Sequence, residues 1–311
     1  MKKLISIVIP SYNEQDCVEE LAKRLKLLFQ IESVYDFEVI LVENGSSDLT
    51  WEKFCALASN DRRFKVVKLS RNFRMDGGLT AGLSQISGDA CVLMCADLQD
   101  PPELISEFLR LWELGWENVY GIVTKRTGTN ILRRINSRAF YWLAGHLTDG
   151  RIPQNASDFR LVDKRVYLVV REMQERNRFV RGLFAWTGFR SIGIPMVRPE
   201  RFAGVSNAPT LKVLDLAFKG IFAHSYKPLR MITILGVLIF LGTIVSFGIL
   251  VYKWISEGVP FPGYGIAVSI SLIALGLFGL MLGIMSEYLG LVYEEVKGRP
   301  NYVISETINI E

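Results

Sequence analysis

Short apolar runs alternate with amphipathic stretches along the N-terminal part of the chain. Residues 4–9 (LISIVI) are typical of a buried strand that ends at Pro10. Residues 16–29 follow with apolar side chains at the spacing of one helix face. The same alternation predicts strands at 37–42, 65–69 and 90–95, and helices at 50–59 and 77–86. Strands that alternate with helices predict an α/β domain with a mostly parallel sheet and helices on both faces.

The C-terminal part of the chain has a different hydrophobic pattern. Residues 231–252 carry no charged side chain, and neither do residues 258–286. A helix of ~20 apolar residues crosses the hydrocarbon core of a membrane, so we expect two spans, at about 231–252 and 266–286. The alternative is a pair of buried core helices. Lysines and arginines flank the outer ends of both runs, which predicts that both termini and the long N-terminal domain are cytoplasmic.

Two stretches between these parts are predicted to lie on the membrane surface. Residues 130–147 mix arginines with Phe140, Tyr141 and Trp142, and a second amphipathic stretch falls within 206–230. The alternative for each is an ordinary surface helix of a globular domain.

Composition agrees with a membrane protein and excludes some classes. Half of the residues are hydrophobic, and the mean hydropathy is +0.23. The net charge is only +4, without a broad basic patch among aromatics, so we expect no nucleic-acid partner. The cysteines at 17, 55, 91 and 95 form no Cys-x-x-Cys pair, and we expect them to be reduced.

Polar residues follow three of the predicted strands. They are the stretch from Pro10 to Glu14, the pair Glu43 and Asn44, and Asp97. In parallel α/β sheets, ligands bind beyond the carboxyl ends of the strands. We therefore expect these clusters to converge on one ligand site.

Several of these motifs resemble a known family. IVIPSYNE, ENGSSDLT, LSRNF and ADLQDPPELI, in this order, are similar to glycosyltransferase family 2, which has the Rossmann-like GT-A fold. NASDFRL, RFVRGLFAWTGFR and the two apolar runs look like its polyprenyl-phosphate branch, which includes dolichyl-phosphate mannose synthase and bacterial undecaprenyl-phosphate glucosyltransferases. The resemblance implies an inverting transfer of one sugar from a nucleotide sugar to a polyprenyl phosphate.

The resemblance also implies a divalent cation, Mg²⁺ or Mn²⁺, at Asp97 and Gln99. A hard cation bound by oxygen ligands neutralises a departing diphosphate. The family has Asp-x-Asp here, but Cys95 stands at the first position, and a thiol is a soft ligand that suits Mg²⁺ poorly. The alternative is that Asp97 only caps the next helix.

For the nucleotide, the resemblance implies a site at Pro10, Tyr12, Glu14, Glu43 and Asn44, together with Asp97. A carboxylate at Glu43 can accept hydrogen bonds from a ribose hydroxyl or a base N–H. The family has Asp-Asp where this chain has Glu43-Asn44, so the base stays open, with a UDP-sugar favoured. The alternative is a turn in which Asn tolerates a strained backbone.

Asp158 in NASDFRL is at the position of the family's catalytic Asp. A phosphate monoester is mostly ionised at pH 7, so we expect Asp158 to orient acceptor or sugar more than to remove a proton. The alternative is a structural carboxylate paired with Arg160.

Arginines are expected at both phosphate groups of the reaction. We expect Arg126, Arg133 and Ser137 at the acceptor phosphate. Arg178 and Arg201, with Arg181 as a further candidate, are expected at the donor diphosphate or in a closing loop. The alternative for each arginine is an anchor to anionic lipids.

Together these expectations describe a multi-pass enzyme of the bacterial inner membrane with a cytoplasmic catalytic domain. The expected parts are a catalytic domain at 1–205, a juxtamembrane helix at 206–230, spans within 231–290 and a cytoplasmic tail at 291–311. Relatives suggest a homo-oligomer, a tetramer. The alternatives are a non-catalytic scaffold and a processive polysaccharide synthase, although the chain lacks the latter's Gln-x-x-Arg-Trp motif.

Overall fold

The computed structural model describes residues 2–126, 156–199, 201–202, 227–257 and 263–310. The chain divides into two units. The first comprises Met1–Leu214 with Gly298–Glu311, and the second is Asp215–Lys297. The predicted surface helices at 130–147 and within 206–226 lie outside the described residues.

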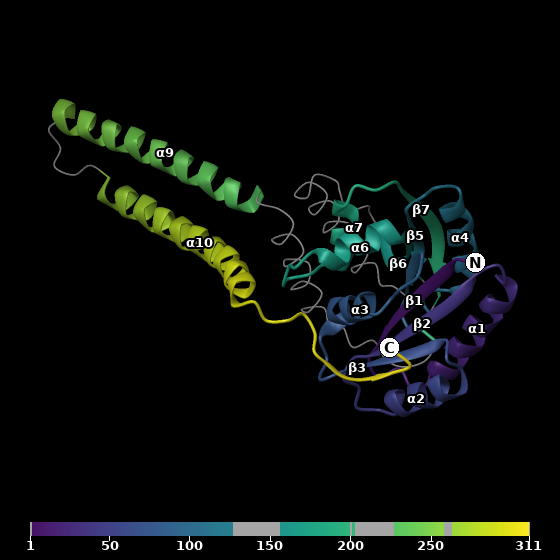
Figure 1. Ribbon diagram of the computed structural model, residues 1–311. Coiled ribbons are helices and arrows are strands. Elements are labelled where there is room, and N and C mark those ends of the chain that lie inside the picture. The colour runs from purple at the N-terminus through teal and green to yellow at the C-terminus, as the bar shows by residue number, and fades with distance from the viewer. Residues whose placement is uncertain (1, 127–155, 200, 203–226, 258–262, 311) are drawn as a thin grey trace. The chain divides into compact units, whose positions relative to one another are not determined.

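The first unit is built on an eight-stranded sheet with the order β7-β5-β6-β4-β1-β2-β3-β8 (Figure 1). Strands β4, β1, β2 and β3 are parallel, and β5 is parallel to β7. Strand β6 is antiparallel to both of its neighbours, and β8 is antiparallel to β3. The strands are β1 Leu4–Ser11, β2 Asp36–Glu43, β3 Phe64–Leu69, β4 Ala90–Leu93, β5 Asn118–Arg126, β6 Ala156–Asp163, β7 Ser191–Arg198 and β8 Ile304–Ile308.

Helices cover both faces of this sheet, because successive side chains of each strand point to opposite faces. Ile5, Ile7 and Ile9 of β1 join one apolar cluster, and Val8 joins the other. Helices α1, α2 and α4 pack on the first face, and α3, α6 and α7 pack on the second. The helices are α1 Val18–Ile31, α2 Thr50–Asn60, α3 Arg74–Ser84, a short 3₁₀ turn Pro102–Leu104, α4 Ile105–Glu113, α6 Lys164–Glu172 and α7 Val180–Trp186. The predicted mostly parallel α/β sheet is confirmed.

The C-terminal residues return to this sheet, which the expectation of a plain tail at 291–311 did not include. Strand β8 covers the edge of β3, and Ser70 N donates to Val303 O at 3.0 Å. The side-chain amide of Asn309 donates to Ala58 O and Phe64 O, both at 2.9 Å. These bonds make the C-terminal residues part of the first unit.

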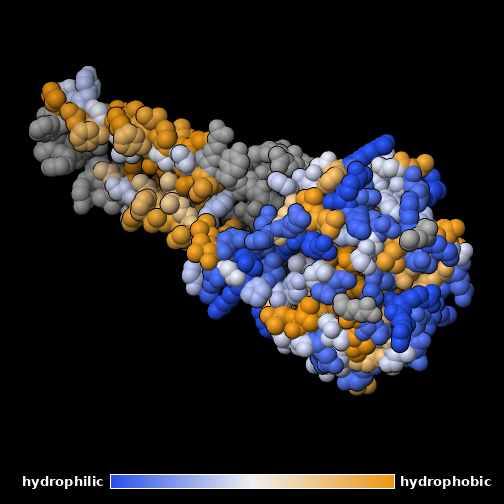
Figure 2. Space-filling view, viewed as in Figure 1, coloured by the Kyte–Doolittle hydropathy of each residue, from blue (hydrophilic) through white to orange (hydrophobic). Residues whose placement is uncertain are grey.

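The second unit contains two long apolar helices, α9 Lys227–Glu257 and α10 Tyr264–Lys297. Each is long and apolar enough to span a membrane, over Ile232–Lys253 and Ile273–Lys297. Apart from Ile232, no described side chain in these spans is buried, and Figure 2 shows hydrophobic side chains along the surfaces of both helices. Exposed apolar helices favour membrane spans over the alternative of core helices.

Candidate active site

The loops that follow β1 and β2 are joined at the carboxyl edge of the sheet. Asn13 N donates to Ser46 Oγ at 3.0 Å, and its side-chain oxygen accepts from Ser47 N at 2.8 Å. Glu14 N donates to Thr50 Oγ1 at 3.0 Å. The loops that carry the first two predicted polar clusters are therefore joined into one rim, as expected from the neighbouring positions of β1 and β2.

Backbone strain gathers at the same edge. Asn13, Arg74 and Leu98 adopt left-handed conformations, with φ of 56°, 63° and 58°, although none is glycine. They follow the ends of β1, β3 and β4. Such conformations cost of the order of 1 kcal/mol each and concentrate at functional sites. Leu98 lies between Asp97 and Gln99, so the strained residue fixes the turn that carries the predicted metal ligands.

Asp97 and Glu14 are brought together by one arginine. Arg201 lies 3.3 Å from Asp97 Oδ2 and 3.7 Å from Glu14 Oε1. Burial raises the pKa of Glu14, and Asp97 raises it further, whereas Arg201 opposes both effects. Gln99 Nε2 donates to Pro199 O at 3.1 Å, so Pro199 and Arg201 both contact the Asp97–Gln99 turn.

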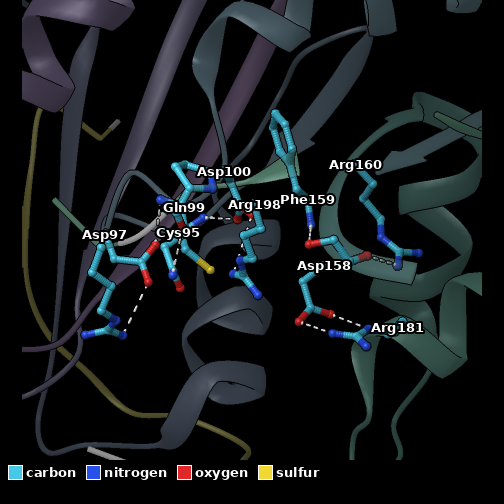
Figure 3. A network of polar contacts seen from close by, with 12 residues as sticks. Cys95, Asp97, Gln99, Asp100, Asp158, Phe159, Arg160, Arg181 and Arg198 are labelled. Carbon is cyan, nitrogen blue, oxygen red and sulfur yellow. Dashed lines mark hydrogen bonds and ion pairs between the residues drawn. The ribbon is translucent and has the colours of Figure 1, made fainter. Parts of the chain in front are cut away.

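Cys95 and Asp100 lie behind this turn (Figure 3). Asp100 is fully buried, and its Oδ2 accepts from Cys95 N at 3.0 Å. Arg198 Nη2 lies 3.5 Å from Asp100 Oδ1. Burial, with the nearby Asp100 and Asp97, raises the pKa of the Cys95 thiol well above its usual value. The thiol is therefore protonated at neutral pH and is a poor nucleophile.

Asp158 in β6 forms a bidentate ion pair with Arg181 in α7, at 2.9 and 2.6 Å (Figure 3). Burial works to raise the pKa of Asp158, but the charge and hydrogen bonds of Arg181 outweigh it and hold the pKa below its usual value. Arg160 donates to Ser157 O at 3.0 Å and lies over the Phe184 ring at 5.1 Å. The alternative pairing of Asp158 with Arg160 is thus replaced by a pair with Arg181.

Glu43 and Asn44 are buried and bind the backbone of nearby turns. Glu43 accepts from Ser46 N. Asn44 Oδ1 accepts from Phe73 N, and its Nδ2 donates to Arg74 O, both at 2.8 Å. The side-chain amide of Asn44 thus holds the loop after β3. The strained backbone that the alternative placed on Asn44 falls on Gly45, with φ of 73°.

The remaining predicted residues are spread more widely. Pro10 lies within β1, and Tyr12 is 39% exposed just beyond it. Arg178 donates to Met173 O at 2.6 Å and to Val170 O at 2.7 Å, so it holds the end of α6 and does not join the carboxylates at Asp97.

The expected acceptor-phosphate group falls largely beyond the described chain. Arg126 ends β5 and pairs in register with Arg198 at the end of β7. Arg133 and Ser137 lie outside the described residues.

The residues around Asp97 suit a cation that completes its coordination with substrate. Among the described residues, no three His, Cys, Asp or Glu side chains form a group that could hold a metal ion. Mg²⁺ is commonly held by one or two carboxylates together with substrate phosphates. Asp97, with Gln99 beside it and a neutral thiol behind, fits that pattern.

Sequence reasoning missed Arg198 and Asp100 and gave Arg181 a phosphate role. Their partners come from distant elements, so no local spacing links them. The one available signal was the Asp at the end of LQD, immediately after the predicted metal turn.

Comparison with known proteins identifies the family. The model of the glycosyl transferase family 2 matches residues 6–170. A Synechocystis protein named as an uncharacterized glycosyltransferase is 39% identical over 308 residues, which cover 99% of this chain and 96% of that protein. The SfII prophage-derived bactoprenol glucosyl transferase of Shigella flexneri is 32% identical over 304 residues, with 97% and 98% covered.

A solved structure supports the fold. Glucosyl-3-phosphoglycerate synthase from Mycobacterium tuberculosis, in complex with Mn²⁺, UDP and phosphoglyceric acid, superposes with a TM-score of 0.50. It is 20% identical, and the match covers 71% of this chain and 76% of that one. This likeness bears on the fold, and the expected GT-A fold is confirmed. From its sequence and its fold, this chain belongs to glycosyl transferase family 2.

Proposed function

We propose that this glycosyltransferase moves one sugar from a nucleotide sugar, with a UDP-sugar favoured, to a polyprenyl phosphate at a membrane. The observation that carries the proposal is the arrangement of Asp97 and Asp158, each against an arginine, on a chain with two apolar helices. Relatives named bactoprenol glucosyl transferases, which match nearly the whole chain, support a polyprenyl acceptor.

The reaction is a single displacement at the anomeric carbon of the sugar. A phosphate oxygen of the lipid forms the new bond to that carbon while the bond to the nucleoside diphosphate breaks, which inverts the configuration. The lipid phosphate is already mostly ionised near pH 7, because its second pKa is about 6. No strong base is therefore required, and the product is a polyprenyl-phosphate monosaccharide.

The residues of the site divide this work between them. Asp158, held by Arg181, stays ionised and is suited to accept hydrogen bonds from the sugar or to orient the acceptor. The rim at Tyr12, Glu14 and Glu43 is suited to the nucleoside. Asp97 and Gln99 would hold a divalent cation, which neutralises charge on the departing diphosphate when it is bound.

The membrane arrangement is part of the same proposal. Helices α9 and α10 serve as the two spans, with both termini and the sheet domain on the cytoplasmic side of the bacterial inner membrane. Arg126, Arg133 and Ser137 are proposed at the lipid phosphate. We also propose that the protein works as a homo-oligomer, a tetramer.

The test uses purified full-length protein with undecaprenyl phosphate and a panel of labelled UDP- and GDP-sugars. Label that enters the lipid phase from one donor would identify the donor and the reaction together. A ladder of products longer than one sugar would favour a processive synthase. A protein whose melting temperature is unchanged by UDP or GDP with Mn²⁺, and which moves no label, would be a scaffold instead.

A further inference from the structure

Arg198 stands between the two acidic centres of the site. In Figure 3 its guanidinium points into the space between Asp97 with Cys95 on one side and Asp158 on the other. It is the last residue of β7, and only 23% of its side chain is exposed. Because a strand end fixes its backbone, the charge is held in place rather than carried on a long loop.

The pairing of Arg198 with Asp100 is incomplete. The two groups lie 3.5 Å apart, which is an ion pair but a poor hydrogen bond. Within the described part of the chain, Asp100 Oδ1 and Arg198 Nε are both buried and have no hydrogen-bond partner. A guanidinium offers five N–H donors, and leaving buried donors unused costs free energy. Such donors are suited to an anion that enters the site.

The other arginines near the site have closer partners than Arg198 has. Arg181 is occupied by Asp158, and Arg178 by the carbonyls at the end of α6. Arg201 contacts Asp97 and Glu14 at the nucleoside side. Cys95 stands where the family has Asp, so this position adds no carboxylate to the surroundings of Arg198.

We propose that Arg198 is a catalytic residue that binds the β-phosphate of the donor, the group that leaves with the bonding electrons when the sugar is transferred. This inference rests on the proposed function, and it replaces Arg178 with Arg198 at the donor diphosphate. Negative charge grows on that phosphate as its bond to the anomeric carbon breaks. A preorganised guanidinium that meets the growing charge stabilises the transition state more than the bound substrate.

The experiment measures the Kd of UDP and of UMP for the full-length protein in detergent, without metal and with Mn²⁺. The variants are Arg198→Lys and Arg198→Met. A third, Arg198→Met with Asp100→Asn, removes both charges and so avoids an unpaired buried carboxylate. The matched control is Arg165→Met, an arginine whose side chain is 71% exposed. GDP and GMP replace UDP and UMP if the wild type prefers guanine.

We expect Arg198→Met and the double variant to bind UDP at least tenfold more weakly, with the Kd of UMP changed less than twofold. The Kd of UDP for Arg198→Lys is expected to lie between those of the wild type and Arg198→Met, because lysine keeps the charge but loses the planar donors. Unchanged UDP affinity, or an equal loss of affinity for UMP, would overturn the inference. A wild type that binds neither UDP nor GDP would refute the proposed function itself.

Discussion

The Arg181–Asp158 pair offers a direct test of how the site is held. Replacing Arg181 with Met removes the charge and both hydrogen bonds but keeps most of the apolar stem. The side chains are 21% and 28% exposed. Breaking a fully buried pair costs about 3–5 kcal/mol, and an exposed pair contributes about 0–1 kcal/mol. For this intermediate burial we expect a loss of about 2–3 kcal/mol in the free energy of unfolding.

The assay is thermal unfolding followed by tryptophan fluorescence. For a domain of this size, 1 kcal/mol corresponds to about 2–4 °C, so the expected fall in Tm is about 5–10 °C. Adding Asp158→Asn to Arg181→Met removes the unpaired carboxylate, and we expect the double variant to regain most of the lost stability. Arg165→Met, which breaks contacts of an exposed side chain, serves as control and should lower Tm by less than about 2 °C.

The pH dependence supplies a second readout with a definite sign. In the wild type the pKa of Asp158 is held low, so the pair stabilises the fold at neutral pH and is lost only as pH falls through that lowered pKa. Without Arg181, burial raises the pKa, so the variant is least stable at neutral pH and recovers as the pH is lowered. A Tm equal to wild type at pH 7, or a double variant as unstable as Arg181→Met, would refute the reasoning.

Three further changes test other parts of the site. Asp97→Asn should abolish the rise in Tm caused by UDP with Mn²⁺ and lower transferase activity at least 100-fold. A variant with wild-type activity would refute the assignment of Asp97 as a metal ligand. Asn44→Asp loses the donor to Arg74 O and should lower stability by about 2 kcal/mol in a urea titration, whereas the exposed Asn72→Asp keeps its acceptor role and should not. Burial, above other effects, raises the pKa of Asp76 to about 6, so wild-type stability should fall as pH rises from about 4 to 6. Asp76→Asn should flatten this dependence of stability on pH. An unchanged slope would contradict the assignment of the pH dependence to Asp76.

The alternating strands and helices could be predicted because each has its own local pattern of apolar residues. Apolar residues at strand or helix spacing located every element from β1 to β4 within a few residues. The apolar runs within α9 and α10 were equally visible. Strand β8 could not be predicted from ISETI, because a short polar edge strand has no distinctive pattern and is defined by its pairing with β3.

The site was predictable in its location but not in its ion pairs. The ends of β1, β2 and β4 identified Glu14 and Asp97 as neighbours in space. Nearness in sequence suggested Arg160 for Asp158, yet Arg181 from another element reaches it with better geometry. A side chain's partner depends on how helices pack on the sheet, which local spacing does not encode.

The strained backbone and the weakly paired buried carboxylate occur in the same short stretch of the chain. A left-handed Leu98 destabilises the fold, as does an Asp100 carboxylate buried with one weakly paired oxygen. In a site selected only for stability, glycine would replace Leu98 and an apolar side chain would replace Asp100. Both costs fall within the short stretch that also carries Asp97 and Gln99. The stability of the surrounding parallel sheet holds this stretch in an unfavourable conformation, beside the proposed site of sugar transfer.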